Sequence, residues 1–396
     1  MILEYVRSDA SREIINLESA IDVTDDWEYI QTSNKLEFIK SFLPKFLSGQ
    51  KIVLFDANHK QLLDFYNNNN INDLENIQEV NRESRILFFT SGSSGFPVGA
   101  FKTRDNLLLE VASLKKILAQ REIKRVVVTV PFVHIYGILA GLLLPMELGD
   151  VRLVVKEDFL PYELLEEASR EETLVITTPV FIKALAKLSS EASLSSALFV
   201  SSTAPLSLED VESFEDKYSS KVAQLFGSTE TGGIAYKIGR GVEWTPQNGV
   251  SIETQDDKLS VKSPFISKYV LREKIEELPQ PYATEDIVEI ANGAFTLIGR
   301  SNKLIKIAGK RISATQIENI LEEIPQIQRA IVELVYKKEL LRSERIFITL
   351  EATQKLEKKL IKEKIAQYYG VTTIPFTLKY LDKINYSAVG KKVVFS

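Results

Sequence analysis

Short apolar runs alternate with amphipathic stretches of helical spacing from about Lys51 to Gly232. Strands separated by helices usually enter a parallel sheet whose faces the helices cover. The sequence therefore predicts an α/β fold for this part of the chain. The expected strands cover Lys51–Phe55, Ile86–Phe89, Arg125–Val130, Val151–Val155, Leu174–Thr177, Ala197–Ser201 and Ala223–Phe226. The expected helices cover Lys60–Tyr66, Arg104–Ala119, Ile135–Glu147, Pro161–Ser169, Pro179–Leu188 and Leu208–Tyr218.

The pattern changes after about Gly232. Residues 242–299 hold short β-like runs separated by prolines and glycines, which predicts a small antiparallel or barrel-like part. From Arg300 the order of elements is typical of a smaller α+β domain. Its expected elements are strands at Leu304–Ile307, Ala330–Tyr336, Arg345–Glu351 and Phe376–Tyr380, and helices at Ala314–Glu323 and Glu357–Tyr368. We therefore expect a large N-terminal domain at residues 1–299 and a mobile C-terminal domain at residues 300–396.

Composition excludes several classes of function. The 396 residues include no cysteine and two histidines, and the net charge is −5. Disulfides, thiolate nucleophiles and cysteine-bound metals are therefore excluded, and a multi-histidine metal site is not expected. The acidic balance without a dense basic run argues against a nucleic-acid partner.

The sequence gives no membrane signal. The longest apolar run, near Ile135–Met146, is too short to cross a bilayer and contains two glycines and a proline. The first 20 residues lack the cationic start and apolar core of a signal peptide. We expect a cytoplasmic protein with no membrane partner.

The segment from Ile86 to Gly99 predicts a phosphate-binding loop. The apolar run Ile86–Phe89 leads directly into the loop residues Thr90, Ser91, Gly92, Ser93, Ser94 and Gly95. Glycines allow close backbone approach, and successive N–H groups with small hydroxyls form a cradle for an anion. Alone, such a loop is more often a tight surface turn. It is not a Walker A loop, because no Gly-Lys-Ser/Thr closes it.

Five further motifs follow in order along the chain. They are Val130–Gly137 with a lone His134, Phe226–Gly233 with Glu230 among small residues, Tyr282–Asp286, Gly299–Gly309, and Tyr386–Lys391. Each has a simpler explanation when taken singly. Glu230 could be a solvated loop charge, Phe226 a core aromatic and His134 a core histidine. Asp286 or Arg300 could form a surface ion pair, and Lys391 could lie in a frayed tail.

Together these motifs resemble the adenylate-forming superfamily of acyl- and aryl-CoA synthetases, nonribosomal adenylation domains and luciferases. The resemblance covers roughly residues 84–396. It implies that Thr90–Gly95 holds the β- and γ-phosphates of ATP, that Thr229 contacts the α-phosphate, and that Glu230 binds Mg²⁺. It places Phe226 against adenine on one side, with Ser202, Thr203 and Ala204 on the other, and counts Gly227 and Ser228 among the nucleotide-binding residues.

The resemblance also implies roles for the remaining motifs. Asp286 would accept hydrogen bonds from the ribose hydroxyls, with Arg300 supporting the ribose. His134 would line the acyl pocket and gate the thiol tunnel. Lys391 would neutralise charge on the carboxylate and α-phosphate during adenylation. Rotation about the hinge at Asn302 would then withdraw Lys391 and bring the loop around Gly309 to the thiol.

The chain departs from the superfamily pattern at several positions. Val98 replaces a lysine that would contact the phosphates, and Lys102 is a nearby cation that could compensate or point elsewhere. Glu285 stands where a glycine is expected, Asn302 replaces the hinge aspartate, and Asn385 replaces a proline. Few residues precede the phosphate loop, so we expect an abbreviated first subdomain.

The expected activity is that of an ATP-dependent acid–thiol ligase that uses Mg²⁺ and CoA. A closer similarity to short ligases of aryl-polyene pathways, carried by Gly232–Tyr236 and Trp244–Pro246, favours an aryl or short acyl acid. It also leaves open the phosphopantetheine of an acyl carrier protein as the acceptor. A non-catalytic member that binds nucleotide or acyl ligand is the alternative from another class, because Val98 and Glu285 depart from the pattern.

Overall fold

The computed structural model describes residues 1–17, 21–55, 83–90, 98–272, 274–300, 304–307, 310–336, 344–369, 376–386 and 392–393. Contacts divide the chain into two compact units. The first comprises Met1–Ile252 and Val261–Tyr282, and the second comprises Glu253–Ser260 and Ala283–Ser396. The mobile-domain boundary expected between residues 299 and 300 stays a prediction.

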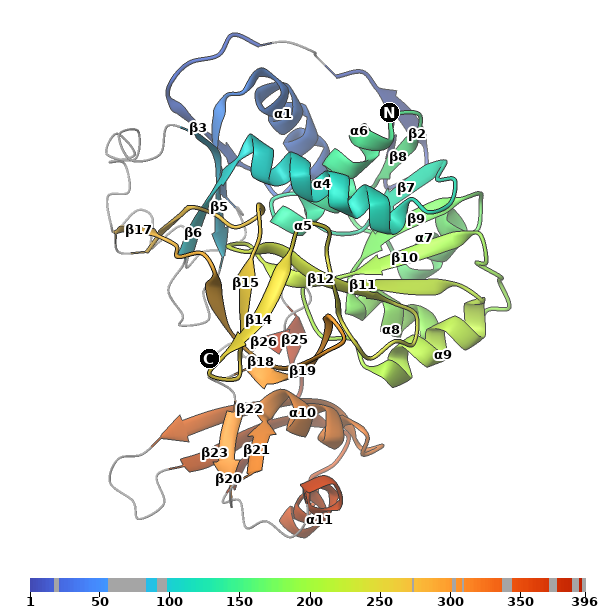
Figure 1. Cartoon of the computed structure of the whole chain (residues 1–396). Coiled ribbons are helices and arrows are strands. Elements are labelled where there is room, and N and C mark those ends of the chain that lie inside the picture. The colour runs from blue at the N-terminus through green and yellow to red at the C-terminus, as the bar shows by residue number, and fades with distance from the viewer. Residues whose placement is uncertain are drawn as a thin grey trace. The chain divides into compact units, whose positions relative to one another are not determined.

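A nine-stranded sheet forms the centre of the first unit (Figure 1). Its strand order is β13 (Thr245–Pro246), β12 (Gly232–Ile238), β11 (Lys221–Ser228), β10 (Ala197–Ser201), β9 (Thr173–Thr177), β7 (Arg125–Val128), β8 (Arg152–Val155), β1 (Ile2–Val6) and β2 (Arg12–Ile15). Strands β11, β10, β9, β7, β8 and β1 are parallel, and the strands at both edges are antiparallel. This arrangement confirms the predicted α/β class.

A second sheet of the first unit has six strands. Their order is β17 (Ile275–Glu277), β16 (Tyr269–Leu271), β6 (Val98–Thr103), β5 (Ser84–Thr90), β4 (Lys51–Phe55) and β3 (Trp27–Gln31). Strands β5 and β6 are antiparallel neighbours, with Thr90 opposite Val98. The expected helix at Lys60–Tyr66 lies outside the described residues.

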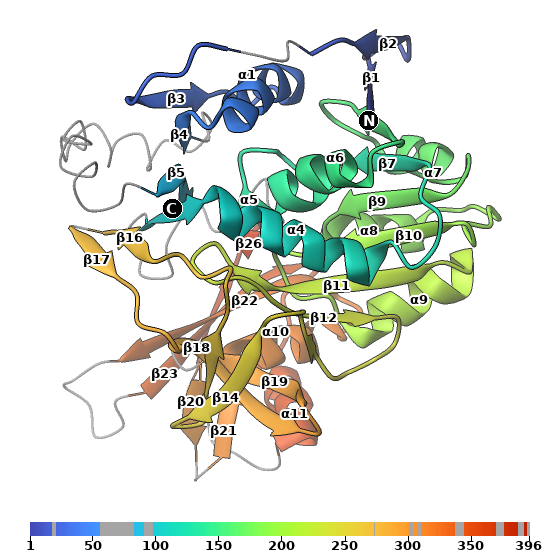
Figure 2. The same cartoon turned by 45° about the horizontal axis from the view of Figure 1, so that its top comes forward.

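Helices fill the space between the sheets and cover the outer face of the larger one (Figure 2). The inner helices are α1 (Lys35–Ser48), α4 (Arg104–Leu118), α5 (Ile135–Ile138) and α6 (Leu144–Leu148), with a π-helical turn at Leu139–Leu143. The outer helices are α7 (Pro161–Ala168), α8 (Pro179–Lys187) and α9 (Leu208–Tyr218). The helix expected at Ile135–Glu147 is thus present, but a π-helical turn at Leu139–Leu143 interrupts it.

The second unit contains smaller sheets. An open sheet lies mostly in this unit and is formed by β14 (Ser251–Gln255), β15 (Lys258–Lys262), β18 (Tyr282–Ala291) and β19 (Ala294–Arg300), with Ser251, Ile252, Val261, Lys262 and Tyr282 belonging to the first unit. Helices α10 (Ala314–Glu322) and α11 (Lys358–Tyr369) share an apolar core with β22 (Ile327–Tyr336), β23 (Glu344–Ala352) and β24 (Phe376–Tyr380). Two-stranded pairs are β20 (Leu304–Ile307) with β21 (Lys310–Ser313), and β25 (Asn385–Tyr386) with β26 (Lys392–Val393).

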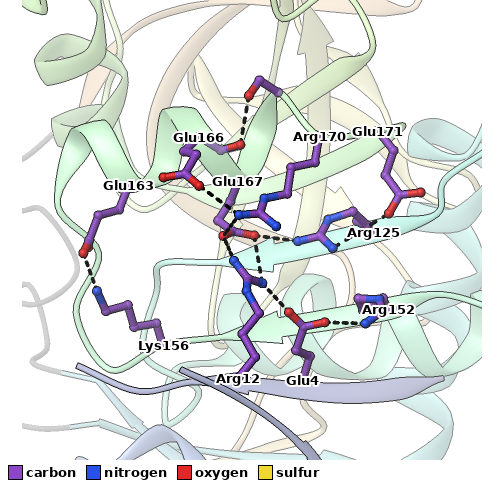
Figure 3. A network of polar contacts seen from close by, with 11 residues as sticks. Glu4, Arg12, Arg125, Arg152, Lys156, Glu163, Glu166, Glu167, Arg170 and Glu171 are labelled. Carbon is purple, nitrogen blue, oxygen red and sulfur yellow. Dashed lines mark hydrogen bonds and ion pairs between the residues drawn. The ribbon is translucent and has the colours of Figure 1, made fainter. Parts of the chain in front are cut away.

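An ionic network joins helix α7 to the sheet in the first unit (Figure 3). The Glu167 carboxylate accepts hydrogen bonds from Arg125, at 2.6 Å, and from Arg12. Glu4 bonds to Arg12 and, at 2.5 Å, to Arg152. Arg125 and Arg152 stand at the amino ends of β7 and β8. The network therefore stabilises the edge of the sheet opposite to the carboxyl ends of its strands.

We expect Glu167→Ala to lower the free energy of unfolding by about 3–5 kcal/mol, because it leaves a buried guanidinium without its closest carboxylate. The guanidinium is that of Arg125, which is 4% exposed. Glu166→Ala on the same helix is the matched control and should cost no more than about 1 kcal/mol, since its partner Arg170 is partly exposed. Denaturant titration measures both values. Equal losses would contradict a stabilising role for the network.

Candidate functional site

The carboxyl edge of the parallel strands collects most of the described residues that the sequence predicts for the site. His134 follows β7, Ser202–Ala204 follow β10, and Phe226–Glu230 end β11 and begin the turn to β12. Strands β9 and β7 are direct neighbours, as are β10 and β11. Ligands of open α/β sheets bind at this edge. The structure thus brings these three segments to one side of the first unit.

The turn from Ser228 to Thr231 is closed by its own hydroxyl groups. The Ser228 N–H donates to Thr231 Oγ1 at 3.0 Å, and the Thr231 N–H donates to Ser228 Oγ at 3.2 Å. The Thr231 hydroxyl also donates to the Gly232 carbonyl at 2.8 Å. A Cβ on Gly227 would collide with the Gly232 carbonyl oxygen, so only glycine fits this approach. Thr229 and Glu230 are therefore held at the tip of a tight turn.

Glu230 is half-buried, and no described side chain donates a hydrogen bond to its carboxylate. Such a carboxylate fits a hard cation, since Mg²⁺ takes one or two protein carboxylates together with phosphate oxygens. Within the described ranges, no group of three or more His, Cys, Asp or Glu side chains comes together to hold a metal. A Mg²⁺ ion bound at Glu230 would also take phosphate oxygens and water as ligands.

Phe226 lies against a second aromatic ring. The centroids of Phe226 and Trp244 are 5.3 Å apart, and the Lys237 ammonium stands 4.8 Å from the centre of the Trp244 ring. Burial lowers the pKa of Lys237. The Ser202 hydroxyl donates to the Leu225 carbonyl at 3.0 Å and so fastens the loop after β10 to β11.

Thr203 in that loop has a φ of +77°. Positive φ is a strained conformation for a β-branched residue, and such strain concentrates at functional sites. This strained backbone stands in the segment that the sequence predicts to line the nucleotide, which supports a binding role for it.

His134 is half-buried and precedes the first turn of α5. Its neighbour Tyr136 is buried, and the Tyr136 hydroxyl lies 2.8 Å from the Val200 carbonyl and 3.1 Å from the Thr177 carbonyl. These contacts fasten the start of α5 to β9 and β10. A Cβ on Gly137 would collide with the Pro131 carbonyl. The backbone next to His134 is thus held by other residues of the Val130–Gly137 motif.

In the second unit, Asp286 and Arg300 face each other across β18 and β19. The Arg300 Nε donates to Asp286 Oδ1 at 2.9 Å. Glu285, the bulky departure from the expected glycine, is exposed and forms an ion pair with Lys258 at 3.0 Å. Because side chains alternate along a strand, Glu285 points away from the face that carries Asp286.

Lys102 does not act as the missing lysine of the phosphate loop. It is fully buried in β6, and its ammonium donates to the carbonyl oxygens of Glu230 at 3.1 Å and Phe265 at 2.5 Å. The structure therefore favours the alternative in which the strand turns this cation elsewhere.

Several predicted site residues lie outside the described part of the chain or have only their backbone described. Only the backbone of Thr90 is described, as the last residue of β5. The predicted site residues outside the described part are Ser91, Gly92, Ser93, Ser94, Gly95, Asn302, Gly309 and Lys391. Within the described ranges, every helix is too short or too polar to span a bilayer.

The α/β fold and the residues at the carboxyl edge of its larger sheet belong to a part of the chain that a known protein family matches. The family model for AMP-binding enzymes matches residues 23–262, which is more than half of the chain. The chain therefore belongs to the AMP-binding enzyme family.

Named relatives agree with this assignment. A 4-coumarate–CoA ligase of Cereibacter sphaeroides is 28% identical over 255 residues, or 64% of this chain and 57% of that protein. A probable 4-coumarate–CoA ligase of Dictyostelium discoideum is 24% identical and matches 93% of this chain and 70% of its own length. The match thus spans little more than half of the first of these relatives.

Solved structures of similar fold include o-succinylbenzoate CoA synthetase (MenE) from Bacillus subtilis. It has a TM-score of 0.77 at 19% identity, covering 94% of this chain and 87% of that chain. ATP-bound MatB from Rhodopseudomonas palustris also has a TM-score of 0.77, at 14% identity, covering 98% of this chain and 93% of that chain. At these identities the likeness concerns the fold alone.

Proposed function

We propose that this protein activates a small carboxylic acid with ATP and passes the acyl group to the thiol of CoA. The observation that carries the proposal is the tight turn at Ser228–Thr231, which holds Thr229 and Glu230 at the end of β11, the strand paired with β10, from which the strained loop at Thr203 continues. Membership in the AMP-binding family and likeness to named CoA ligases support it. The identity of the acid and the choice of CoA as the acceptor are the most specific parts of the proposal.

In the first half-reaction an oxygen of the substrate carboxylate attacks the α-phosphorus of ATP. The bond from that phosphorus to the bridging oxygen breaks, and pyrophosphate leaves. Thr229 is proposed to donate a hydrogen bond to the α-phosphate, and Lys391 to offset the negative charge that builds up there. Magnesium, when bound, would neutralise phosphate charge, and Glu230 is the residue proposed to hold it.

In the second half-reaction the thiol sulfur attacks the acyl carbon, AMP leaves, and the thiol proton passes to solvent. His134 is proposed to line the entry to the acyl group, and Gly309 to lie beside the incoming pantetheine. Phe226 is proposed to contact adenine on one side and Ser202, Thr203 and Ala204 on the other, with Gly227 and Ser228 among the nucleotide-binding residues. Thr90–Gly95 are proposed to hold the outer phosphates. Asn302 is the proposed hinge about which the C-terminal domain turns between the two half-reactions.

An exchange of labelled pyrophosphate into ATP, over a panel of aryl and short acyl acids, tests the first half-reaction. We expect exchange with at least one acid. Binding of ATP without exchange for any acid would instead favour a non-catalytic nucleotide-binding protein. The acid that supports exchange is then offered with CoA or with a holo acyl carrier protein, and the faster thioester product identifies the acceptor.

Asp286 gives a prediction specific to the ribose. We expect Asp286→Ala to weaken ATP binding about 10–100-fold, because hydrogen bonds to a carboxylate contribute about 1.5–3 kcal/mol. The variant should also lose any preference for ATP over 2′-deoxy-ATP. Glu285→Ala is the matched control, since that neighbouring acid faces the other way and pairs with Lys258. A retained preference in Asp286→Ala would contradict the proposed ribose contact.

A further inference from the structure

Two buried charged side chains, Lys102 and Glu110, hold the segment that begins at Glu230. Lys102 on β6 is 0% exposed and Glu110 on α4 is 4% exposed. The Lys102 ammonium donates to the Glu230 carbonyl at 3.1 Å, and Glu110 Oε1 accepts the Gly233 N–H at 2.7 Å. The cation and the carboxylate thus bind the two ends of residues 230–233.

Further contacts complete this attachment. The Glu230 carbonyl also accepts the Ser267 N–H at 2.8 Å, and the Lys102 ammonium reaches the Phe265 carbonyl at 2.5 Å. Lys102 therefore joins three backbone segments that are distant in sequence. One of them is β6 itself, which starts at Val98, directly after the predicted phosphate loop.

Gly232 and Gly233, which follow Thr231, lie close to the carboxylate of Glu110. A Cβ on Gly232 would lie 2.6 Å from Glu110 Oε2, and a Cβ on Gly233 would lie 2.8 Å from Glu110 Oε1. Gly232 also has a φ of +69°, which disfavours other residues. The backbone can approach the carboxylate this closely only because both positions lack a side chain.

This arrangement is costly, which argues that it does more than fill space. Burial lowers the pKa of Lys102 and raises the pKa of Glu110, so burial disfavours both charged forms. Removing a charged side chain from water costs free energy, and apolar side chains of similar volume fill buried space without that cost.

We propose that Lys102 and Glu110 are positioning residues that fix the backbone of residues 230–233 and so aim Thr229 and Glu230 at the nucleotide. Neither residue touches the substrate in this proposal. Lys102 also makes the position of this segment depend on β6, the strand that leaves the phosphate loop. The inference rests on the proposed function, because it concerns the grip of the same site on ATP and its metal.

Lys102→Met tests the proposal, because it keeps the length of the side chain and removes its donors. We expect kcat/KM for MgATP to fall about 10–100-fold, since small misplacements of a reacting group cost up to about 10²-fold. The KM for the acid should change by less than about 2-fold, because binding of the acid does not depend on the position of the Glu230 side chain.

Lys51→Met is the matched control. Lys51 is a buried lysine of the same sheet whose ammonium donates to the Asp25 carbonyl at 2.7 Å, away from the 230–233 segment. We expect this variant to lose stability while its nucleotide kinetics stay at the wild-type values. Lys102→Met with wild-type kinetics per folded molecule, whatever its thermal midpoint, would overturn the positioning role.

Calorimetric titration with ATP, with and without Mg²⁺, separates this inference from the proposed function. We expect Mg²⁺ to tighten ATP binding to the wild type and to do so much less in Lys102→Met. A wild type that binds MgATP but exchanges no pyrophosphate would contradict the proposed function and leave this comparison valid. Should Lys102→Met fail to fold, Glu110→Met, which removes the acceptor of the Gly233 N–H, tests the other end, and an unchanged affinity for MgATP in that variant would overturn the inference.

Discussion

Lys391→Ala should reduce pyrophosphate exchange by about 10²–10³-fold, the usual cost of removing one preorganised group that stabilises charge in a transition state. ATP affinity should change little, because the proposed contact forms as the carboxylate attacks the α-phosphorus. A mutation of this kind lowers kcat and kcat/KM together. Exchange rates and calorimetric ATP affinities, measured on the same preparations, test this expectation.

The second half-reaction provides an internal control for Lys391. If the C-terminal domain withdraws this lysine before thiol transfer, Lys391→Ala should still form thioester from synthetic acyl-adenylate and CoA at close to the wild-type rate. Lys392→Ala, at the adjacent position, should leave both half-reactions unchanged. Equal losses of ATP affinity and exchange, or a loss of thioester formation from the adenylate, would contradict the assigned role.

The parallel core of the fold could be predicted from the sequence because its signals are local. Each of β8, β9 and β10 is a short apolar run, and each is followed by a helix with regular apolar spacing. The C-terminal strands and helices were predictable for the same reason. Burial of one face of a strand or helix produces an apolar periodicity in the sequence, whichever strand it pairs with in the fold.

The N-terminal strands could not be predicted in this way. Strand β1 pairs with β8, about 150 residues later, and its Glu4 is 3% exposed inside the sheet. A buried acid breaks the apolar pattern unless its partners are known. Those partners, Arg12 and Arg152, come from two other strands. Only the assembled sheet explains why a strand begins the chain.

The residues of the candidate site also divide into those that could be predicted from neighbouring sequence and those that could not. Phe226–Gly233 could be found because its residue types stand next to each other in the sequence. Lys102 and Glu110 act on that segment from 128 and 123 residues away, and neither belongs to a motif. A signal was nevertheless present: Lys102 interrupts an apolar strand, and Glu110 lies on the buried face of α4, three residues after Leu107.

Glu230→Gln gives the second large expected effect. The amide keeps the size of the side chain and removes its charge, so the variant should fold like the wild type while binding a hard cation much less well. We expect pyrophosphate exchange at saturating ATP to fall about 10²-fold or more, comparable to the loss of one preorganised electrostatic group. The Mg²⁺ concentration for half-maximal exchange should rise.

ATP binding in the presence of a chelator separates the metal role from a general defect at this turn. The Ser228–Thr231 hydrogen bonds do not involve the Glu230 side chain, so metal-free ATP should bind Glu230→Gln about as well as it binds the wild type. Glu209→Gln, an exposed acid in the first turn of α9, should behave like the wild type in every assay. A Glu230→Gln variant with an unchanged Mg²⁺ requirement would show that the metal is held by other groups, and the carboxylate would then be a solvated loop charge.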